Sequence, residues 1–146
     1  MKSRTRLGIL ILCVCAIPIA VWGIYALFHG FFDSGTFEVM QSQWSRSKQL
    51  AVVGRRYDHA ALGGLQYFVA IGTHPFSQAD LKHAYYYDGL VFRAGSQCLT
   101  VEWITDHELA VRCSDHSIQS GEIAVQQKQV GNVTIIYQDI PIVSSK

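Results

Sequence analysis

The chain of 146 residues lacks most of the patterns that mark an enzyme or a nucleic-acid-binding protein. No serine stands in a Gly-x-Ser-x-Gly turn, and no glycine-rich loop leads into a helix, so neither an activated nucleophile nor a nucleotide site is indicated. A clustered basic face is also missing, because the adjacent residues Arg55 and Arg56 would point to opposite sides of a strand. We therefore expect no cofactor and no nucleic-acid partner.

Charge is absent from residues 7–28, which read LGILILCVCAIPIAVWGIYALF. A helix of this length extends over about 33 Å, enough to cross a hydrocarbon core of roughly 30 Å. Basic residues precede this segment but do not closely follow it, so the positive-inside rule places the N-terminus in the cytoplasm. The residues expected to flank the anchor are Lys2, Arg4 and Arg6 on the cytoplasmic side and Trp22 and Tyr25 toward the outer side.

The alternatives to an uncleaved anchor fit the residues less well. A cleaved signal peptide needs a shorter apolar core and small residues one and three positions before the cut, whereas Ala20 has Pro18 two positions before it. Neither Cys13 nor Cys15 follows the small residue that lipoprotein processing requires. We therefore expect a single-pass signal-anchor helix in the inner (plasma) membrane, with the rest of the chain in the periplasm or an equivalent extracytoplasmic compartment.

The residues after the anchor form short β-branched and aromatic runs, with turn formers about every ten positions. This spacing predicts a mainly β domain, an antiparallel meander or small sandwich of about seven or eight strands with at most one short helix. The one helical candidate begins at Ser77, which stands at capping-box spacing from Asp80, and ends near Tyr86. The expected strands are 36–42, 49–56, 65–72, 90–94, 100–104, 109–113, 122–127 and 133–137.

These elements predict five consecutive parts of the chain. They are a cytoplasmic N-terminus (1–6), a transmembrane helix (7–28), a juxtamembrane linker (29–36), the β domain (37–137) and a C-terminal tail (138–146).

Residues 99–113 predict a hairpin, because apolar residues alternate along both of its strands. Opposed residues share a face, so Trp103 should lie opposite Leu109 and Val101 opposite Val111. This register leaves a connection at 104–108 that a bulge could close. We expect these four apolar side chains to form the core of the domain together with the apolar face of residues 50–53, with Trp103 at its centre.

Cys98 and Cys113 are the only cysteines outside the anchor. An oxidising compartment favours a disulfide between them, but the hairpin register points Cys98 to the opposite face, so the sequence leaves the bond open. Cys113 also stands near His107, Asp115 and His116, which together offer metal-ligand chemistry. Structural zinc motifs usually contain two ligand pairs, and the second pair is missing here, so we expect no metal.

Four segments resemble, in this order, a family of small bacterial membrane-anchored β-rich envelope proteins. They are Ala-Val-Val-Gly-Arg-Arg at 51–56, Val-Glu-Trp at 101–103, Leu-Ala-Val-Arg at 109–112 and Gly-Asn-Val-Thr-Ile-Ile-Tyr at 131–137. The resemblance covers most of the β domain. It implies a fold and a location in the envelope, and it implies no activity.

The sequence is therefore typical of a non-enzymatic envelope protein whose β domain binds another protein, since exposed strand edges can pair with a partner. Its expected partners are the lipid bilayer and a protein of the envelope. The alternative is an extracytoplasmic metal-binding or hydrolytic protein that uses Asp58 and His59, or His107 and His116. A polar hairpin connection also explains the loop that contains Asp58 and His59.

Overall fold

The computed structural model describes residues 17–24, 35–58, 64–114 and 118–143, and the chain divides into two units, Met1–Asp33 and Ser34–Lys146. In the first unit, residues 17–24 are helical and include Trp22. The other expected anchor flanks, Lys2, Arg4, Arg6 and Tyr25, lie outside the described residues. None of the helices in the described ranges combines the length and the apolar character needed to span a membrane.

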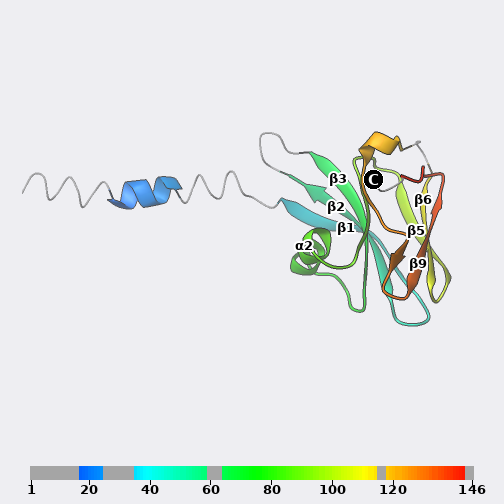
Figure 1. Ribbon diagram of the computed structural model, residues 1–146. Helices are drawn as coiled ribbons and strands as arrows, with labels where there is room; N and C mark the ends of the chain where they lie inside the picture. Colours follow the sequence, from blue (N-terminus) through cyan, green and yellow to red (C-terminus); the bar gives the residue numbers. More distant parts are fainter. Residues whose placement is uncertain (1–16, 25–34, 59–63, 115–117, 144–146) are drawn as a thin grey trace, which may run out of the picture. The chain divides into compact units, whose positions relative to one another are not determined.

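The second unit is mainly β, as predicted, and its strands form two sheets (Figure 1). The first sheet has the order β1-β2-β3-β4-β7, with β1 at Thr36–Trp44, β2 at Leu50–Tyr57, β3 at Leu65–Gly72, β4 at Leu90–Ala94 and β7 at Ile123–Gln126. The second has the order β5-β6-β9-β8, with β5 at Leu99–Thr105, β6 at Glu108–Cys113, β9 at Val133–Gln138 and β8 at Gln129–Val130. The two helices of this unit are α2 (Gln78–Tyr86) and the single 3₁₀ turn η1 (Ser120–Glu122).

The prediction allowed an antiparallel meander or a small sandwich, and the two sheets with their shared apolar core correspond to the second of these. The prediction missed the two-residue strand β8 and the turn η1, so the described residues hold nine strands and two helices in this unit. Strand β9 pairs with β6 in parallel. The chain leaves β6, adds β7 to the first sheet and returns through β8, and such a crossover is what parallel neighbours require.

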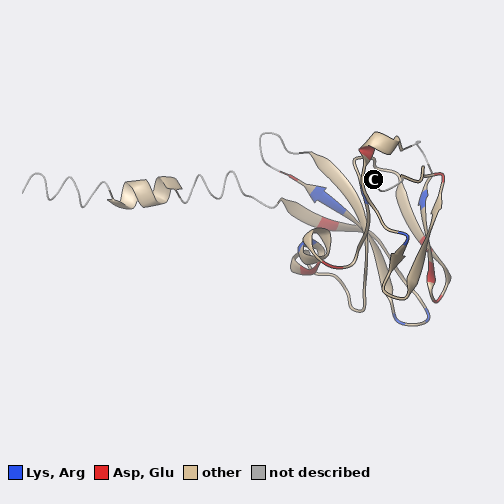
Figure 2. Ribbon diagram, viewed as in Figure 1, with Lys and Arg blue, Asp and Glu red and all other residues tan. Residues whose placement is uncertain are grey.

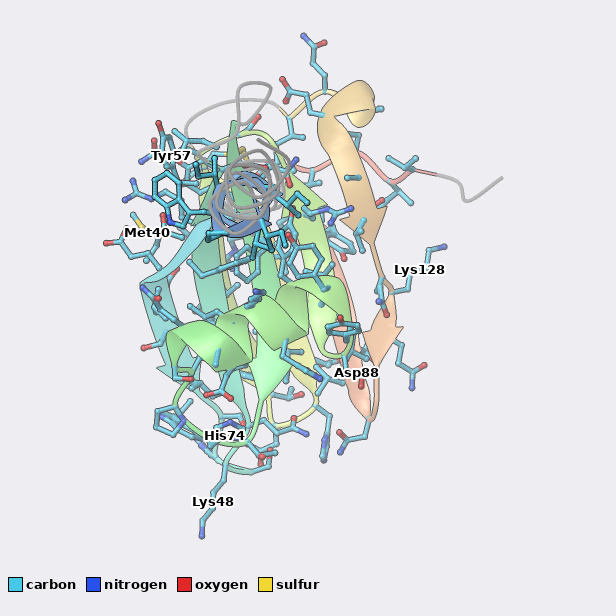
Figure 3. All side chains as sticks on the ribbon, turned by 90° about the vertical axis from the view of Figure 1, so that its left-hand side faces the viewer. Met40, Lys48, Tyr57, His74, Asp88 and Lys128 are labelled. Carbon is cyan, nitrogen blue, oxygen red and sulfur yellow. A yellow bond between two sulfur atoms is a disulfide. The ribbon has the colours of Figure 1, made fainter. Side chains whose placement is uncertain are left out.

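Alternation along β2 gives the domain two apolar layers. Ala51 and Val53 face the other sheet and join the core between the sheets. Leu50 and Val52 face the opposite way and pack, together with Phe68, beneath α2. Figure 3 shows α2 lying across the outer face of the first sheet.

Helix α2 begins where the capping-box spacing predicts. The Ser77 hydroxyl accepts a hydrogen bond from the Asp80 amide at 3.2 Å, and the Asp80 carboxylate accepts one from the Ser77 amide at 2.9 Å. The helix buries Leu81, Ala84 and Tyr85 against the sheet. This contact covers the apolar layer that would otherwise face solvent.

The β5–β6 hairpin has the predicted register, with Trp103 opposite Leu109 and Val101 opposite Val111. The turn is shorter than expected, because β5 continues to Thr105 and the irregularity between Trp103 and Thr105 absorbs one residue. Val101, Leu109 and Val111 are buried.

Trp103 is not the centre of this core, which corrects the prediction. Its side chain is only partly buried and packs against the margin of the cluster. The reason is its position one residue from the irregularity that leads into the turn, where the strand leaves the space between the sheets. The largest fully buried side chains are instead Phe68 and Phe92.

The described residues beyond 138, where a tail was expected, lie on the domain. Ile140 is only 7% exposed. The Gln126 side chain donates a hydrogen bond to the Pro141 carbonyl at 3.0 Å and accepts one from the Val143 amide at 2.7 Å. The folded part therefore extends at least to residue 143.

Candidate functional site

Three turns meet at one end of the domain (Figure 1). The Ser47 hydroxyl in the β1–β2 turn donates a hydrogen bond to the Asp106 carbonyl in the β5–β6 turn at 3.1 Å. Gln49 donates to the Asn132 side chain of the β8–β9 turn at 2.9 Å, and Asn132 in turn lies 3.2 Å from Nδ1 of His107. These bonds connect loops that are far apart in sequence.

The β1–β2 turn is held by its own polar groups. Ser45 is buried, and its hydroxyl accepts a hydrogen bond from the Gln49 amide at 3.0 Å. Lys48 adopts a left-handed backbone conformation with φ of 62°, which reverses the chain. The side chains of this turn are therefore presented from a fixed backbone.

Strand β1 is an edge of the first sheet and β5 is an edge of the second, and side chains of β1 cover the backbone of β5. The Gln41 amide group both donates to the Val101 carbonyl and accepts from the Val101 amide, each at 3.2 Å. The Gln43 side chain accepts from the Trp103 amide at 3.3 Å, and the Trp103 indole donates to the Gln43 carbonyl at 2.9 Å. At Val101 and Trp103, the edge of β5 is thus already occupied, which removes these groups from pairing with an added strand.

A hollow with a volume of about 420 Å³ lies between the tips of the β1–β2 and β5–β6 hairpins. Its apolar lining comes from Trp44, Trp103 and Ile104, and its charged lining comes from Arg46 and Asp106. Trp44 is 49% exposed and Ile104 is 47% exposed, which is high for large apolar side chains. We call this hollow the tip groove.

The tip groove offers binding chemistry, because it combines aromatic surface, one cation, one anion and hydroxyl groups. Tryptophan and arginine are the side chains most enriched at the energetic centres of protein interfaces. The hydrogen bond of Trp103 to Gln43 holds the indole of the groove lining in one orientation. The Trp103 ring is therefore already in a fixed position before a partner binds.

Prediction from sequence did not find the tip groove. The expected strand 36–42 ends before Trp44, whereas β1 continues to that residue. The sequence offers one signal, which is that Trp44 stands beside the polar residues Ser45 and Arg46 and that a second tryptophan stands in the predicted hairpin at 99–113. Sequence alone does not say that the two hairpin tips are neighbours.

The two outer cysteines form a disulfide, with 4.7 Å between the Cα atoms of Cys98 and Cys113. Cys98 precedes the first residue of β5 and is not bound by the alternation of that strand, which is why the register argument left the bond open. Both residues are buried. Because its sulfur is bonded to Cys98, Cys113 does not offer a thiolate to a metal.

Of the other polar candidates, only Asp58 and His107 lie within the described residues. His59, Asp115 and His116 lie outside the described residues. The Asp58 carboxylate forms an ion pair with Arg56 at 2.6 Å, and His107 is exposed beside Asn132. Within the ranges that the structure describes, no three histidine, cysteine, aspartate or glutamate residues are grouped as a metal site would require.

Comparison of the chain with protein-family models, with curated proteins and with solved structures finds no match.

Proposed function

We propose that this chain is a single-pass membrane-anchored protein whose β domain lies outside the cytoplasm and binds another protein at the tip groove. The anchor is the segment at 7–28 and the membrane is the inner (plasma) membrane. The β domain acts as a binding module rather than as an enzyme.

Two features support the anchor and the extracytoplasmic location. The uncharged segment at 7–28 follows Lys2, Arg4 and Arg6, which is the charge distribution of a helix with a cytoplasmic N-terminus. The disulfide between Cys98 and Cys113 fits an oxidising compartment, because such bonds rarely persist in a reducing cytoplasm.

The observation that carries the binding function is the exposure of Trp44 and Ile104 in the tip groove. Large apolar side chains that gather in a hollow lose water when a partner covers them, and this burial is the main favourable term in protein association. Arg46 and Asp106 at the rim supply charges that orient a partner. Because the β5 edge is covered at Val101 and Trp103, side chains at the tip are better placed for this role than the strand edge there.

The topology is tested by reporter fusions placed after Lys146. A reporter that is active only outside the cytoplasm should be active in the full chain, and a reporter that needs the cytoplasm should be silent. The opposite pattern would overturn the membrane part of the proposal.

The binding function is tested by site-specific photocrosslinking in intact cells. A crosslinking amino acid in place of Ile104 should give a defined protein adduct, because this residue lies in the tip groove. The same amino acid in place of Tyr87 is the matched control, since Tyr87 is 74% exposed but lies at the end of α2. Equal adducts at both positions, or none at Ile104, would argue against a binding site at the groove.

A further inference from the structure

The two rims of the tip groove carry opposite charge. Arg46 and Lys48 project from the β1–β2 turn, and both are exposed. Asp106 lies in the β5–β6 turn and Glu108 begins β6. Arg46 and Asp106 line the groove itself, and Lys48 and Glu108 stand two residues further along the same hairpins. Figure 2 shows the basic tip beside the acidic hairpin at the same end of the domain. We call these the basic rim and the acidic rim.

Within the described part of the chain, the ion pairs join other residues and leave the four rim side chains without an opposite charge in contact. The pairs are Arg55 with Glu38, Arg56 with Asp58, His74 with Asp80, and Arg112 with Glu102. Acidic and basic side chains elsewhere in the domain thus form internal pairs, whereas Arg46 and Lys48 are exposed, and Asp106 and Glu108 are partly exposed, with no such pair among the described residues.

Between the rims lies apolar surface. Trp44 and Ile104 are about half exposed, and Trp103 is fixed beside them by its bonds to Gln43. A partner that fits this end of the domain must therefore present an apolar centre, an acidic side and a basic side, in that order. The tip groove itself presents this arrangement.

We infer that the partner bound at the tip groove is a second copy of this chain, an inference that rests on the proposed function. In a two-fold dimer the same patch faces itself, so residue i of one copy meets residue j of the other and the reverse contact also forms. A two-fold axis that runs along the groove, between the rims, places the basic rim of each copy against the acidic rim of the other. Trp44 of each copy then covers Ile104 of the other at the centre.

The charges in such an interface chiefly choose the partner and fix its orientation. Charge reversal therefore gives a sharp test. Where Arg46 of one copy faces Asp106 of the other, Arg46→Asp sets two carboxylates against each other, and Asp106→Arg sets two guanidinium groups against each other. Each variant should therefore pair weakly with its own copies, while in a heterodimer of the two variants residues 46 and 106 carry opposite charges at both contacts.

The experiment uses the full chain in detergent micelles and measures the dissociation constant of the dimer by sedimentation equilibrium. The wild type should dimerise, and each single variant should dimerise at least about tenfold more weakly, since like charges in an interface are strongly unfavourable. The equimolar mixture of the two variants, and the double variant Arg46→Asp/Asp106→Arg, should recover to within about threefold of the wild type.

Lys128→Asp is the matched control, because Lys128 is exposed on a different part of the domain from Lys48 (Figure 3). This control should leave the dissociation constant unchanged. If the membrane segment alone held the dimer together, neither rim variant would change the dissociation constant, and that result would overturn the inference. Loss of dimer in both single variants without recovery in their mixture would overturn it as well.

Photocrosslinking at Ile104 separates this inference from the proposed function. Mass spectrometry of cells that express ordinary and isotope-labelled chains should identify an adduct of two copies. An adduct with a different protein, together with a monomeric chain, would overturn the inference and leave the binding function standing. The absence of any adduct at Ile104 would overturn both the dimer inference and the proposed binding function.

Discussion

At the scale of single residues, the partly buried Tyr137 shows how a hydroxyl links the two sheets. It lies on β9 of the second sheet. Its single hydroxyl hydrogen can be donated to the carbonyl of Gln127, at 2.6 Å, and the carbonyl of Val91, in β4 of the first sheet, is a second acceptor within reach at 3.3 Å. Burial raises the pKa of Tyr137 above its ordinary value. The folded state therefore holds this side chain in its neutral form, in which it can donate.

The first prediction concerns the substitution Tyr137→Phe. At pH 7 it should lower the free energy of unfolding by about 0.5–1.5 kcal/mol, because the hydrogen bond to the Gln127 carbonyl is lost. A raised pKa contributes stability that is complete below the unfolded-state value of about 10 and is lost as the pH rises above it. In urea titrations, the difference between wild type and variant should thus narrow above about pH 10. Tyr137→Phe is matched by Tyr87→Phe at an exposed position, and a gap that widens at high pH would contradict the argument.

The second prediction ranks two apolar residues of the β5–β6 hairpin. Leu109 is 0% exposed, so Leu109→Ala should lower the free energy of unfolding by about 3–4 kcal/mol. Trp103→Ala should cost less than about 3 kcal/mol, although tryptophan is larger, because its ring is only partly buried. Thermal and urea unfolding of the two variants would decide the order. If Trp103→Ala were the more damaging, the groove tryptophan would have to be part of the central core.

At the scale of elements, the disulfide closes the β5–β6 hairpin at its open end. It joins Cys98, just before β5, to Cys113, the last residue of β6, across a separation of 15 residues. A covalent link of this span limits the freedom of the unfolded chain and in the loop-entropy account contributes about 3 kcal/mol. The hairpin that supplies the acidic rim is therefore fixed at both ends.

The third prediction follows from this link. Replacing both Cys98 and Cys113 with alanine should lower the free energy of unfolding by about 2–4 kcal/mol, and a reducing agent should destabilise the wild type by a similar amount. The reducing agent should leave the double variant unchanged, which makes that variant its own control. Unfolding curves with and without reductant would test this, and an equal response of both proteins would show that the bond does not stabilise the fold.

The elements also show what a single sequence can and cannot predict. Strands β3 and β4 begin and end where the apolar patterns predict, because both are bounded by turn residues. The parallel pairing of β6 with β9 could not be predicted from the sequence, since the alternation of apolar residues in a strand is the same for parallel and antiparallel neighbours. The tip groove could not be predicted for a related reason: it depends on hydrogen bonds between turns about 60 residues apart, and no local pattern records that proximity.

At the scale of the whole molecule, the disulfide and the proposed anchor make one joint prediction. If residues 7–28 carry the β domain out of the cytoplasm, the pair Cys98 and Cys113 meets an oxidising compartment and becomes bonded. If the domain stays inside, glutathione and thioredoxin keep both thiols reduced. The oxidation state of these two cysteines in the cell therefore reports the side of the membrane on which the domain folds.

The fourth prediction uses the full chain with Cys13→Ala and Cys15→Ala, so that only Cys98 and Cys113 can react. After acid trapping and denaturation, a maleimide reagent should add to neither cysteine, and it should add to both once the sample is reduced. A matched chain in which Ile17→Lys and Ile19→Lys place charge at the centre of the apolar segment should stay in the cytoplasm, because each lysine at the centre of a span costs about 2.5–3.5 kcal/mol. That chain should react at both cysteines without reduction. The free energy of unfolding of its domain should be lower by the amount that the disulfide contributes. Free thiols in the unaltered anchor background would instead mean that the domain resides in a reducing compartment, and the proposed topology would then have to be given up.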